Sequence, residues 1–504
     1  MSKRLRHYCE HLLTKNCEMP QNSSTIALAA LLFSSVACLG AEPPPGDNSS
    51  LPSFAGTNTT IAESLPAGGA SGTGGLAAGG AASGGTSSSE GQGAFAGATN
   101  VVGNGGATGV VSNGGASGVG TGGASGEVVG ALEWLPSWAT TIQSTETANL
   151  PPALPNNTLR QFVWPTFSGQ EIRIQLSNEK GASAVQIQKV HIARALTQAN
   201  PGNSGGQIEP ATDAGFTFNG LANVTIPAGG TVWSDALAFP LQEVQLTAVT
   251  MQFGNGVPPE VTGHPGARTT SYIANGDAVA AQALAGAQTR DRWYFINAIE
   301  VMAPADAYAI AVLGDSITDG YGVLNQFARW TDYLTLRIQG DPTIADARSV
   351  LNFGMGANNL TVSGDFQDSG VVRFGRDVLT RDKIKWLVVL EGINDIVYSN
   401  VQAQPIIDAY GQIIQRAREQ GILVYGSPIT PNGSAGVRAQ VNQWVRTSGA
   451  FDEVIDLETA IADPNNPNSI LARFNNDNLH PNATGYEAMA AAVDLSLFYE
   501  AIGN

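Results

Sequence analysis

The chain has 504 residues and a formal net charge of −17 at pH 7. This length allows two or three domains, and the acidic charge argues against nucleic acid or an anionic membrane surface as a partner. The three cysteines are Cys9, Cys17 and Cys38. Beyond Cys38 there is therefore no thiol for a disulfide framework, a zinc site or nucleophilic catalysis. We expect neither a metal ion nor a cofactor.

Residues 1–38 have the pattern of an export signal, with a basic start, an apolar stretch at 26–33 and small residues after it. The apolar stretch is too short to span a membrane. The small residues before Cys38 fit the lipobox of a bacterial lipoprotein, although Ser35 stands where that motif usually has leucine. Lipidation of Cys38 and plain cleavage after Ala37 both stay open. We expect an exported protein, at the cell surface or outside the cell, that contacts a membrane only through an anchor at Cys38.

Residues 39–130 consist mainly of Gly, Ala, Ser and Thr and contain an imperfect Gly-Gly-Ala repeat. No Lys or Arg occurs between Lys15 and Arg160. Such a composition cannot bury enough apolar surface to fold, and the repeat is too irregular for collagen or a β-helix. The sequence predicts a disordered, flexible spacer here.

Residues 131–303 carry short runs in which apolar and polar residues alternate, as at 172–176 and 249–253. Turn signals rich in Gly and Pro stand between these runs, at 227–230 and 255–259. Alternation with period two is typical of strands that bury one face. The sequence therefore predicts a β-sandwich domain that packs on the domain after it.

Several features of this β region suggest chemistry but have a simpler interpretation. His191 and His264 have no His, Asp or Glu companions at metal-ligand spacing, so we expect surface or hydrogen-bonded histidines. Ser204 lies in a match to the serine-elbow pattern G-x-S-x-G, but no strand precedes it and no helix follows, so we expect a loop. The alanine-rich run 278–287 is compatible with one short helix.

Residues 304–504 alternate strand-like runs with helical periodicity, which predicts a parallel sheet with helices on both faces, a three-layer α/β/α domain. The strand-like runs are 310–313, 350–353, 386–390, 422–425 and 454–457, and the clearest helical patterns are 406–417 and 486–497. Ligands of such sheets bind beyond the carboxyl ends of the strands. The polar residues considered next all follow those ends.

Ser316 stands in a strand-to-helix turn, after an apolar run and Gly314. A turn of this kind presents a hydroxyl at the edge of the sheet, with backbone N–H groups pointing the same way. The turn alone fits a helix cap as well as a nucleophile, and the possible partners of Ser316 favour the nucleophile. Serine needs a base within reach, His480 is suited to that role, and Asp477 can orient the ring from three residues earlier.

An oxyanion needs hydrogen-bond donors that are already in place. The backbone N–H of Gly356 or Ala357 and the amide of Asn394 meet this need, because they follow the second and third strands. Four elements with matching roles make independent coincidence implausible.

These elements resemble the SGNH (GDSL-type) hydrolase family. The first, third and fifth blocks of the family look like Gly314-Asp-Ser-Ile-Thr, Gly392-Ile-Asn394-Asp395 and Asp477-Asn-Leu-His480. The resemblance covers about 305–504 and extends to the preceding β domain through the phrases that begin at Trp134, Thr158 and Thr270.

The resemblance implies roles for these residues. Ser316 would be the nucleophile, His480 the base and Asp477 its orienting acid, while the Ser316 N–H and Asn394 would be oxyanion donors. The sequence departs from the family where the last glycine of the second block is replaced by Ala357, with Gly356 one position earlier. Which of these two residues donates its N–H therefore stays open.

We therefore expect an exported serine esterase that acts through an acyl-enzyme on acyl groups of carbohydrate or small lipids. A lipase for longer-chain lipids is an alternative within the same chemistry. An alternative of another class is a cell-surface carbohydrate-binding protein without catalysis. The set Ser316, Asn394, Asp477 and His480 favours the enzyme.

Overall fold

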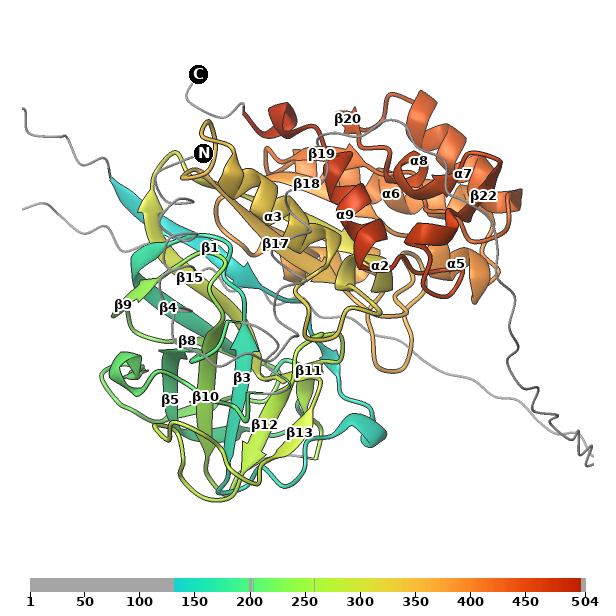
Figure 1. Ribbon diagram of the computed structural model, residues 1–504. Coiled ribbons are helices and arrows are strands. Elements are labelled where there is room, and N and C mark those ends of the chain that lie inside the picture. Colours follow the sequence, from blue (N-terminus) through green and yellow to red (C-terminus); the bar gives the residue numbers. More distant parts are fainter. Residues whose placement is uncertain (1–130, 199–201, 203, 258, 500–504) are drawn as a thin grey trace, which may run out of the picture. The chain divides into compact units, whose positions relative to one another are not determined.

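The computed structural model describes residues 131–198, 202, 204–257 and 259–499 (Figure 1). All of these residues fall in one compact unit. The predicted export signal and spacer, residues 1–130, lie outside the described residues and stay predictions. No helix in the described part of the chain is long and apolar enough to cross a membrane.

The first half of the described chain is rich in antiparallel strands, in two large sheets and one small one, which confirms the expected β-rich region. The first sheet has the order β1 (Leu132–Ala139), β15 (Ile296–Pro304), β4 (Gly169–Ser177) and β8 (Thr231–Trp233), with β9 (Leu237–Leu241) also paired to β4. The second has the order β13 (Gln288–Arg290), β12 (Ser271–Ala274), β3 (Thr158–Val163), β10 (Thr247–Phe253), β5 (Val185–Arg194) and β6 (Ala214–Gly215), with β7 (Val224–Ile226) paired to β5. The third joins β14 (Trp293–Tyr294), β11 (Thr262–His264) and β2 (Gln143–Ser144), and the short 3₁₀ turns are Thr147–Asn149 and Pro210–Thr212.

Alternation explains how these strands pack. On β4 the apolar residues Ile172, Ile174 and Leu176 are fully buried, while the residues between them are partly exposed. Strand β10 is buried on both faces, because Val249 joins the main core and Ala248 joins a second, smaller apolar cluster. The second sheet therefore needs a cover on its outer side as well.

The segment 278–287 helps to cover that side, but it forms turns and not the expected short helix. The buried guanidinium of Arg160 explains why. It donates to the carbonyl oxygens of Gly206 (2.6 Å) and Val279 (2.9 Å) and to the hydroxyl of Thr250 (2.9 Å). Backbone bonds from Ile208 N to the Gln282 carbonyl (2.9 Å) and from Leu284 N to the Gly205 carbonyl (3.1 Å) also tie the segment to the neighbouring loop and not to itself. Ser204 lies in the neighbouring turn, as expected for a loop.

The second half of the described chain is built on a parallel sheet, as predicted. Its order is β17 (Arg348–Gly354), β16 (Tyr308–Gly314), β18 (Ile384–Leu390), β19 (Leu423–Gly426) and β20 (Glu453–Val454). Its helices are α2 (Ser316–Asp319), α3 (Trp330–Gly340), α4 (Gly370–Phe374), α5 (Ile393–Val397), α6 (Ala403–Arg418), α7 (Gly436–Thr447), α8 (Leu457–Ile461) and α9 (Ala483–Ala491). A π-helical turn at Gly375–Leu379, 3₁₀ turns at Ala472–Phe474 and Leu495–Phe498, and the hairpin β21 (Ala462–Asp463) with β22 (Asn466–Ile470) complete it. The three-layer arrangement stays a prediction.

Two expected elements differ from the structure. The run 454–457 contributes only Val454 to a strand, since Leu457 already begins α8 and the Asp456 carboxylate caps that helix. The pattern 486–497 is not one helix, because α9 ends at Ala491 and a separate 3₁₀ turn follows. The Arg337 guanidinium donates to the carbonyl oxygens of Ala490, in the last turn of α9, and of Val493, just beyond it.

The β-rich and α/β regions share one apolar core, which runs without a break from β4 and β10 to the parallel sheet. Strand β1 packs on β17 and β16. Polar groups cross the same junction: Val350 N donates to Thr166 Oγ1 at 3.1 Å, and Thr141 Oγ1 donates to Asp377 Oδ2 at 2.5 Å. The two regions therefore fold against each other and do not form separate cores.

Candidate active site

Ser316 is the first residue of α2, directly beyond the end of β16. The Asp315 carboxylate caps the helix by accepting from Ile317 N at 2.9 Å, and burial raises the pKa of Asp315 to about 7. Gly314 is required by close packing, because a Cβ there would lie 2.1 Å from Thr318 Oγ1. The turn thus holds Ser316 at the sheet edge, with its side chain nearly buried.

Ser316, His480 and Asp477 form a continuous hydrogen-bonded chain. Ser316 Oγ lies 2.8 Å from His480 Nε2. The other ring nitrogen, Nδ1, lies 2.9 Å from Asp477 Oδ2 and 3.1 Å from Asp477 Oδ1. The His480 backbone N also donates to Asp477 Oδ1 at 2.8 Å, which fixes the carboxylate. This arrangement leaves Nε2 as the acceptor for the serine proton.

The surroundings of His480 favour its neutral form. Burial lowers the pKa of His480 below its ordinary value, and Asp477 opposes this only in part. The ring of Tyr321 stacks on the imidazole with 4.2 Å between the centroids. Burial would raise the pKa of Asp477, but hydrogen bonds from His480 bring it below its ordinary value. The pair therefore rests as a neutral imidazole beside a carboxylate, which is the state that a general base requires.

The expected oxyanion donors follow β17 and β18, the two strands that lie on either side of β16. Asn394 is in the first turn of α5, and Gly392, with φ +103°, is the residue that precedes this helix. The side-chain amide of Asn394 donates to the Asn358 carbonyl at 2.8 Å. This bond holds Asn394 against the segment 356–358. Ala357 has φ +59°, the left-handed conformation that glycine adopts without strain. The backbone bends there as a glycine would allow, although the residue is alanine.

Gly356 does not adopt the left-handed conformation of Ala357, and its N–H is the second candidate donor. Among the described residues, neither the Gly356 N–H nor the Ala357 N–H has a hydrogen-bond partner. The carbonyl of Gly356 accepts from Gln367 Nε2 at 2.8 Å. This bond fixes the peptide group between Gly356 and Ala357. Both N–H groups are therefore available to a developing oxyanion.

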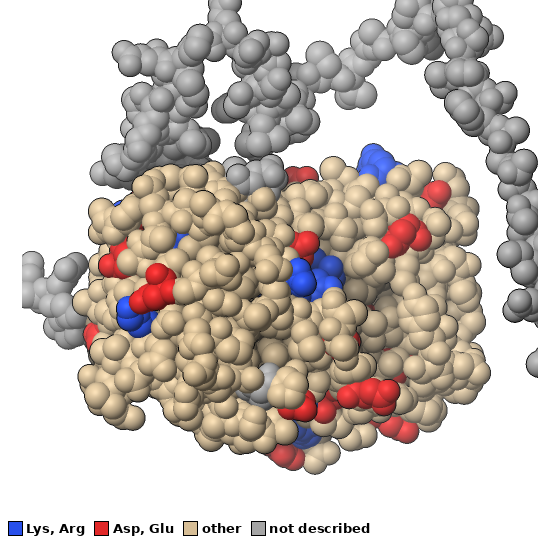
Figure 2. Space-filling model, turned by 90° about the horizontal axis from the view of Figure 1, so that it is seen from below, with Lys and Arg blue, Asp and Glu red and all other residues tan. Residues whose placement is uncertain are grey.

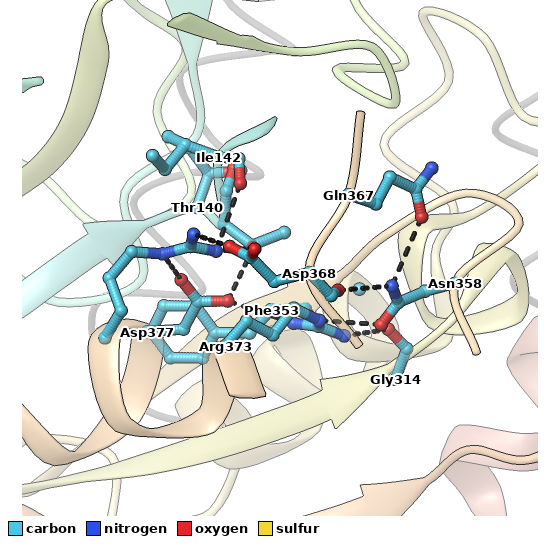
Figure 3. A network of polar contacts seen from close by, with 12 residues as sticks. Thr140, Ile142, Gly314, Phe353, Asn358, Gln367, Asp368, Arg373 and Asp377 are labelled. Atoms are coloured by element: carbon cyan, nitrogen blue, oxygen red, sulfur yellow. Dashed lines mark hydrogen bonds and ion pairs between the residues drawn. The ribbon is translucent and has the colours of Figure 1, made fainter. Parts of the chain in front are cut away.

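A buried arginine under the site was not identified from the sequence. The Arg373 guanidinium donates to the carbonyl oxygens of Gly314 (2.9 Å) and Phe353 (2.8 Å) and to Glu391 Oε1 (2.8 Å). These groups stand at the ends of β16, β17 and β18, so one side chain ties three strand ends together. Figure 3 labels Arg373 with Gly314 and Phe353. Burial raises the pKa of Glu391 well above its ordinary value, and Arg373 opposes this.

The same arginine reaches the oxyanion segment through Asn358. Arg373 Nε donates to Asn358 Oδ1 at 2.7 Å, and Asn358 Nδ2 donates to the Asp368 carbonyl at 2.9 Å and to Gln367 Oε1 at 3.2 Å (Figure 3). Gln367 in turn holds the Gly356 carbonyl. A closed set of side-chain contacts thus supports the segment that carries the N–H donors. No local pattern marks Arg373 for this role, because its partners lie on three different strands.

The β-rich region also reaches the helix that carries Ser316. Asp319, at the end of α2, is buried between His264 Nε2 (3.0 Å) and Arg268 (2.6 Å) of the β-rich region. Burial would raise the pKa of Asp319, but the charges of Arg268 and His264 bring it below its ordinary value. The Arg268 guanidinium also lies 5.3 Å from the Tyr321 ring. The sequence predicts a hydrogen-bonded His264 but not its partner across the junction.

No group of three or more His, Cys, Asp or Glu side chains that could bind a metal ion occurs in the part of the chain that the structure describes. His191 lies 2.9 Å from the Asp213 carboxylate, a single hydrogen-bonded pair.

Comparison with known proteins identifies the α/β region. Residues 312–488 match the model of the GDSL-like Lipase/Acylhydrolase family, which confirms the resemblance seen in the sequence. No curated protein matches the chain. Similar solved structures include a member of the lipolytic protein G-D-S-L family from Veillonella parvula (20% identity, 39% of this chain and 100% of that chain, TM-score 0.30). A second is the carbohydrate acetylesterase Est24 from Sinorhizobium meliloti (14% identity, 37% of this chain and 95% of that chain, TM-score 0.29). A third is the esterase EstA from Pseudoalteromonas sp. (15% identity, 36% of this chain and 93% of that chain, TM-score 0.29). The C-terminal part of the chain, residues 312–488, therefore belongs to the GDSL-like lipase/acylhydrolase family and is a serine ester hydrolase.

Proposed function

We propose that this protein is an exported esterase that cleaves carboxylic esters through a covalent acyl-enzyme on Ser316. The observation that carries the proposal is the hydrogen-bonded chain from Ser316 Oγ through His480 to Asp477, with 2.8 Å between Oγ and Nε2. Serine becomes nucleophilic only when a base takes its proton, and His480 is placed and neutral for that purpose.

The reaction follows from this geometry. Oγ attacks the ester carbonyl carbon while His480 Nε2 takes the hydroxyl proton, and the carbonyl oxygen becomes an oxyanion. The N–H groups of Ser316 and of Gly356 or Ala357, with the Asn394 amide, stabilise that charge. His480 then gives its proton to the departing alcohol, which leaves an acyl group on Oγ. A water molecule, activated by His480 in the same way, releases the acid and restores Ser316.

The proposed substrates are acyl groups on carbohydrate or on small lipids. The pattern of residues 1–38 supports export, with or without a lipid on Cys38, and an exported enzyme meets extracellular polymers. Figure 2 shows a face formed mostly by uncharged residues, with Lys or Arg and Asp or Glu side chains gathered beside a hollow near its centre. A lipase for long-chain lipids is the alternative in the same chemistry. Acetylated xylan, short p-nitrophenyl esters and long-chain lipid esters, assayed side by side, separate these substrate classes.

Ser316→Ala tests the proposal directly. We expect turnover of a short p-nitrophenyl ester to fall by several orders of magnitude, as the loss of a triad serine does elsewhere. A serine-directed phosphonate should label Ser316 and leave Ser204 unlabelled, as mass spectrometry of the digest would show. Normal turnover in Ser316→Ala, with the label on Ser204, would falsify the assignment. No turnover and no label in the unchanged protein would instead favour the non-catalytic carbohydrate-binding protein.

A further inference from the structure

A cavity of about 210 Å³ lies beside the oxyanion segment. Its lining residues are Glu146, Ala357, Asn359, Val362, Gly364, Asp365, Phe366 and Gln367. Ala357 also belongs to the oxyanion segment, so the cavity and that segment share a residue. Glu146 comes from the β-rich region, and the others come from the loop that follows β17. Both regions therefore build this cavity.

The walls of the cavity are held in place. Ser144 N donates to the Phe366 carbonyl at 3.0 Å, so the β-rich region pairs with the loop by a backbone hydrogen bond. Lys180 and Asp368 form an ion pair at 2.7 Å just beyond it. On the other wall, Glu146 accepts from two side-chain amides, Gln143 at 2.7 Å and Asn149 at 3.0 Å. A preformed site of this kind loses little free energy to ordering when a ligand binds.

The lining combines acceptors with apolar surface. The carboxylates of Glu146 and Asp365 and the amides of Asn359 and Gln367 offer hydrogen-bond acceptors, whereas no Lys or Arg is among the lining residues that the structure describes. Val362 and Phe366 are 46% and 42% exposed, so their apolar faces are available to a ligand. Hydroxyl groups donate to carboxylates, and an aromatic face covers the C–H face of a ring. A negatively charged ligand would be repelled by both carboxylates.

Other occupants fit less well. An aliphatic acyl chain would remove water from two carboxylates without any compensating hydrogen bond, which is unfavourable. A cation would be attracted by both carboxylates, so an amino sugar tests whether charge or hydroxyl recognition decides the occupant. The Arg268 guanidinium is near Gly356, but it is paired with buried Asp319 and does not line the cavity. It therefore offers no free charge to an anion.

We propose that this cavity is the subsite for the alcohol part of the ester, that it takes an uncharged sugar residue, and that Glu146 and Asp365 exclude anionic alcohols. This assignment rests on the esterase function proposed above. It makes the β-rich region a determinant of specificity, because Glu146 belongs to it. The volume is below the roughly 300 Å³ at which pockets for larger ligands begin, so one ring is the expected occupant.

Three acetyl esters that differ only in charge test the subsite: an acetylated methyl glucoside, the matching glucuronoside and the matching glucosaminide with a free amine. We expect kcat/KM for the neutral ester to exceed that for the glucuronoside by about tenfold at low ionic strength, and the ratio to shrink in high salt. Glu146→Gln and Asp365→Asn should each reduce this ratio about three- to tenfold. Glu171→Gln, which removes an exposed carboxylate of β4 that does not line the cavity, serves as the matched control and should leave the ratio unchanged.

The apolar wall has its own test. Phe366→Ala should raise KM for the neutral sugar ester several-fold and leave KM for ethyl acetate unchanged, because ethanol has no ring to cover the aromatic face. An unchanged neutral-to-anionic ratio in both carboxylate variants, or a preference for the glucuronoside or the glucosaminide over the neutral ester, would overturn the subsite. Failure of the esterase function itself looks different, because then no ester is cleaved in a way that depends on Ser316.

Discussion

The β-rich and α/β regions of this protein contribute to the site in different ways. The groups for which we propose reacting roles, Ser316, Asn394, Asp477 and His480, all belong to the α/β region. The β-rich region supplies groups that hold or flank them, such as Arg268 on Asp319. Parallel strand ends place many polar groups at one edge, whereas the antiparallel sheets supply rigid walls. The proposed reaction therefore uses groups of the α/β region, while both regions hold those groups in place.

Buried arginines show the same difference between the two regions. Arg160 in the β-rich region binds carbonyl and hydroxyl oxygens of Gly206, Val279 and Thr250, and burial lowers its pKa to about 10. Arg373 in the α/β region also binds carbonyl oxygens, but in addition it pairs with the carboxylates of Asp377 at 3.1 Å and Glu391 at 2.8 Å. The first arginine organises loops, while the second compensates buried negative charge beneath the site. A buried cation therefore stabilises a loop in one region and the catalytic edge in the other.

Removal of the whole β-rich region should have the largest effect. A protein that begins at Pro304 would expose the shared core and leave Asp319 and Asp377 without their partners His264, Arg268 and Thr141. We expect aggregation or loss of a cooperative thermal transition, as measured by circular dichroism and light scattering.

The control is a protein that begins at Leu132, where β1 starts. It lacks only the predicted signal and spacer, so we expect the melting temperature and the rate on small esters to equal those of the full chain. Equal behaviour of the two truncated proteins would show that the β-rich region is an independent module. A slower Leu132 protein would give the spacer a role in catalysis.

Asp477→Asn should have the next largest effect. The amide keeps the shape of the carboxylate but favours the wrong tautomer of His480, so turnover should fall about 10⁴-fold. Activity of the unchanged protein should rise with pH through one ionisation below the ordinary histidine pKa, because burial disfavours the imidazolium. Near-normal rates in Asp477→Asn, measured across the pH range, would mean that another carboxylate orients His480.

Asn394→Ala should follow, with a loss of roughly 100- to 1000-fold in turnover and little change in KM, since the amide acts only on the developing oxyanion. Steady-state kinetics on a short ester separate the two parameters. A higher KM with unchanged turnover would make Asn394 a binding residue. Asn466→Ala is the amide control, because in the part of the chain that the structure describes the Asn466 side chain bonds only Ser469 of the same hairpin.

The smallest of these effects should come from the β-rich region. Arg268 lowers the pKa of His480 through its charge, so Arg268→Ala should raise that pKa. The acidic limb of the kcat/KM profile should then move to higher pH, with a loss of about tenfold or less at neutral pH, since a one-unit shift corresponds to tenfold. A profile that stays in place, in a folded variant, would show that Arg268 acts only on stability.

Local pattern determined much of this protein. Alternation with period two or about 3.6 is a property of adjacent residues, so the β-rich region, the parallel sheet and helix α6 could be predicted from it. The same reasoning singled out Ser316, Asn394, Asp477 and His480, because strand ends and turns are visible locally. The structure brings Ser316, His480 and Asp477 into hydrogen-bond contact.

Only the tertiary structure decided which distant residues meet. His264 and Asp319, Glu146 and Ala357, and Arg373 and its strand ends are brought together by packing of the two regions on one core. The failed predictions have the same origin: segment 278–287 lacks a helix because Arg160 takes its carbonyl oxygens. A hydrogen bond between residues far apart in the chain leaves no periodic trace in the sequence, since it depends on where the sheets pack and not on neighbouring side chains.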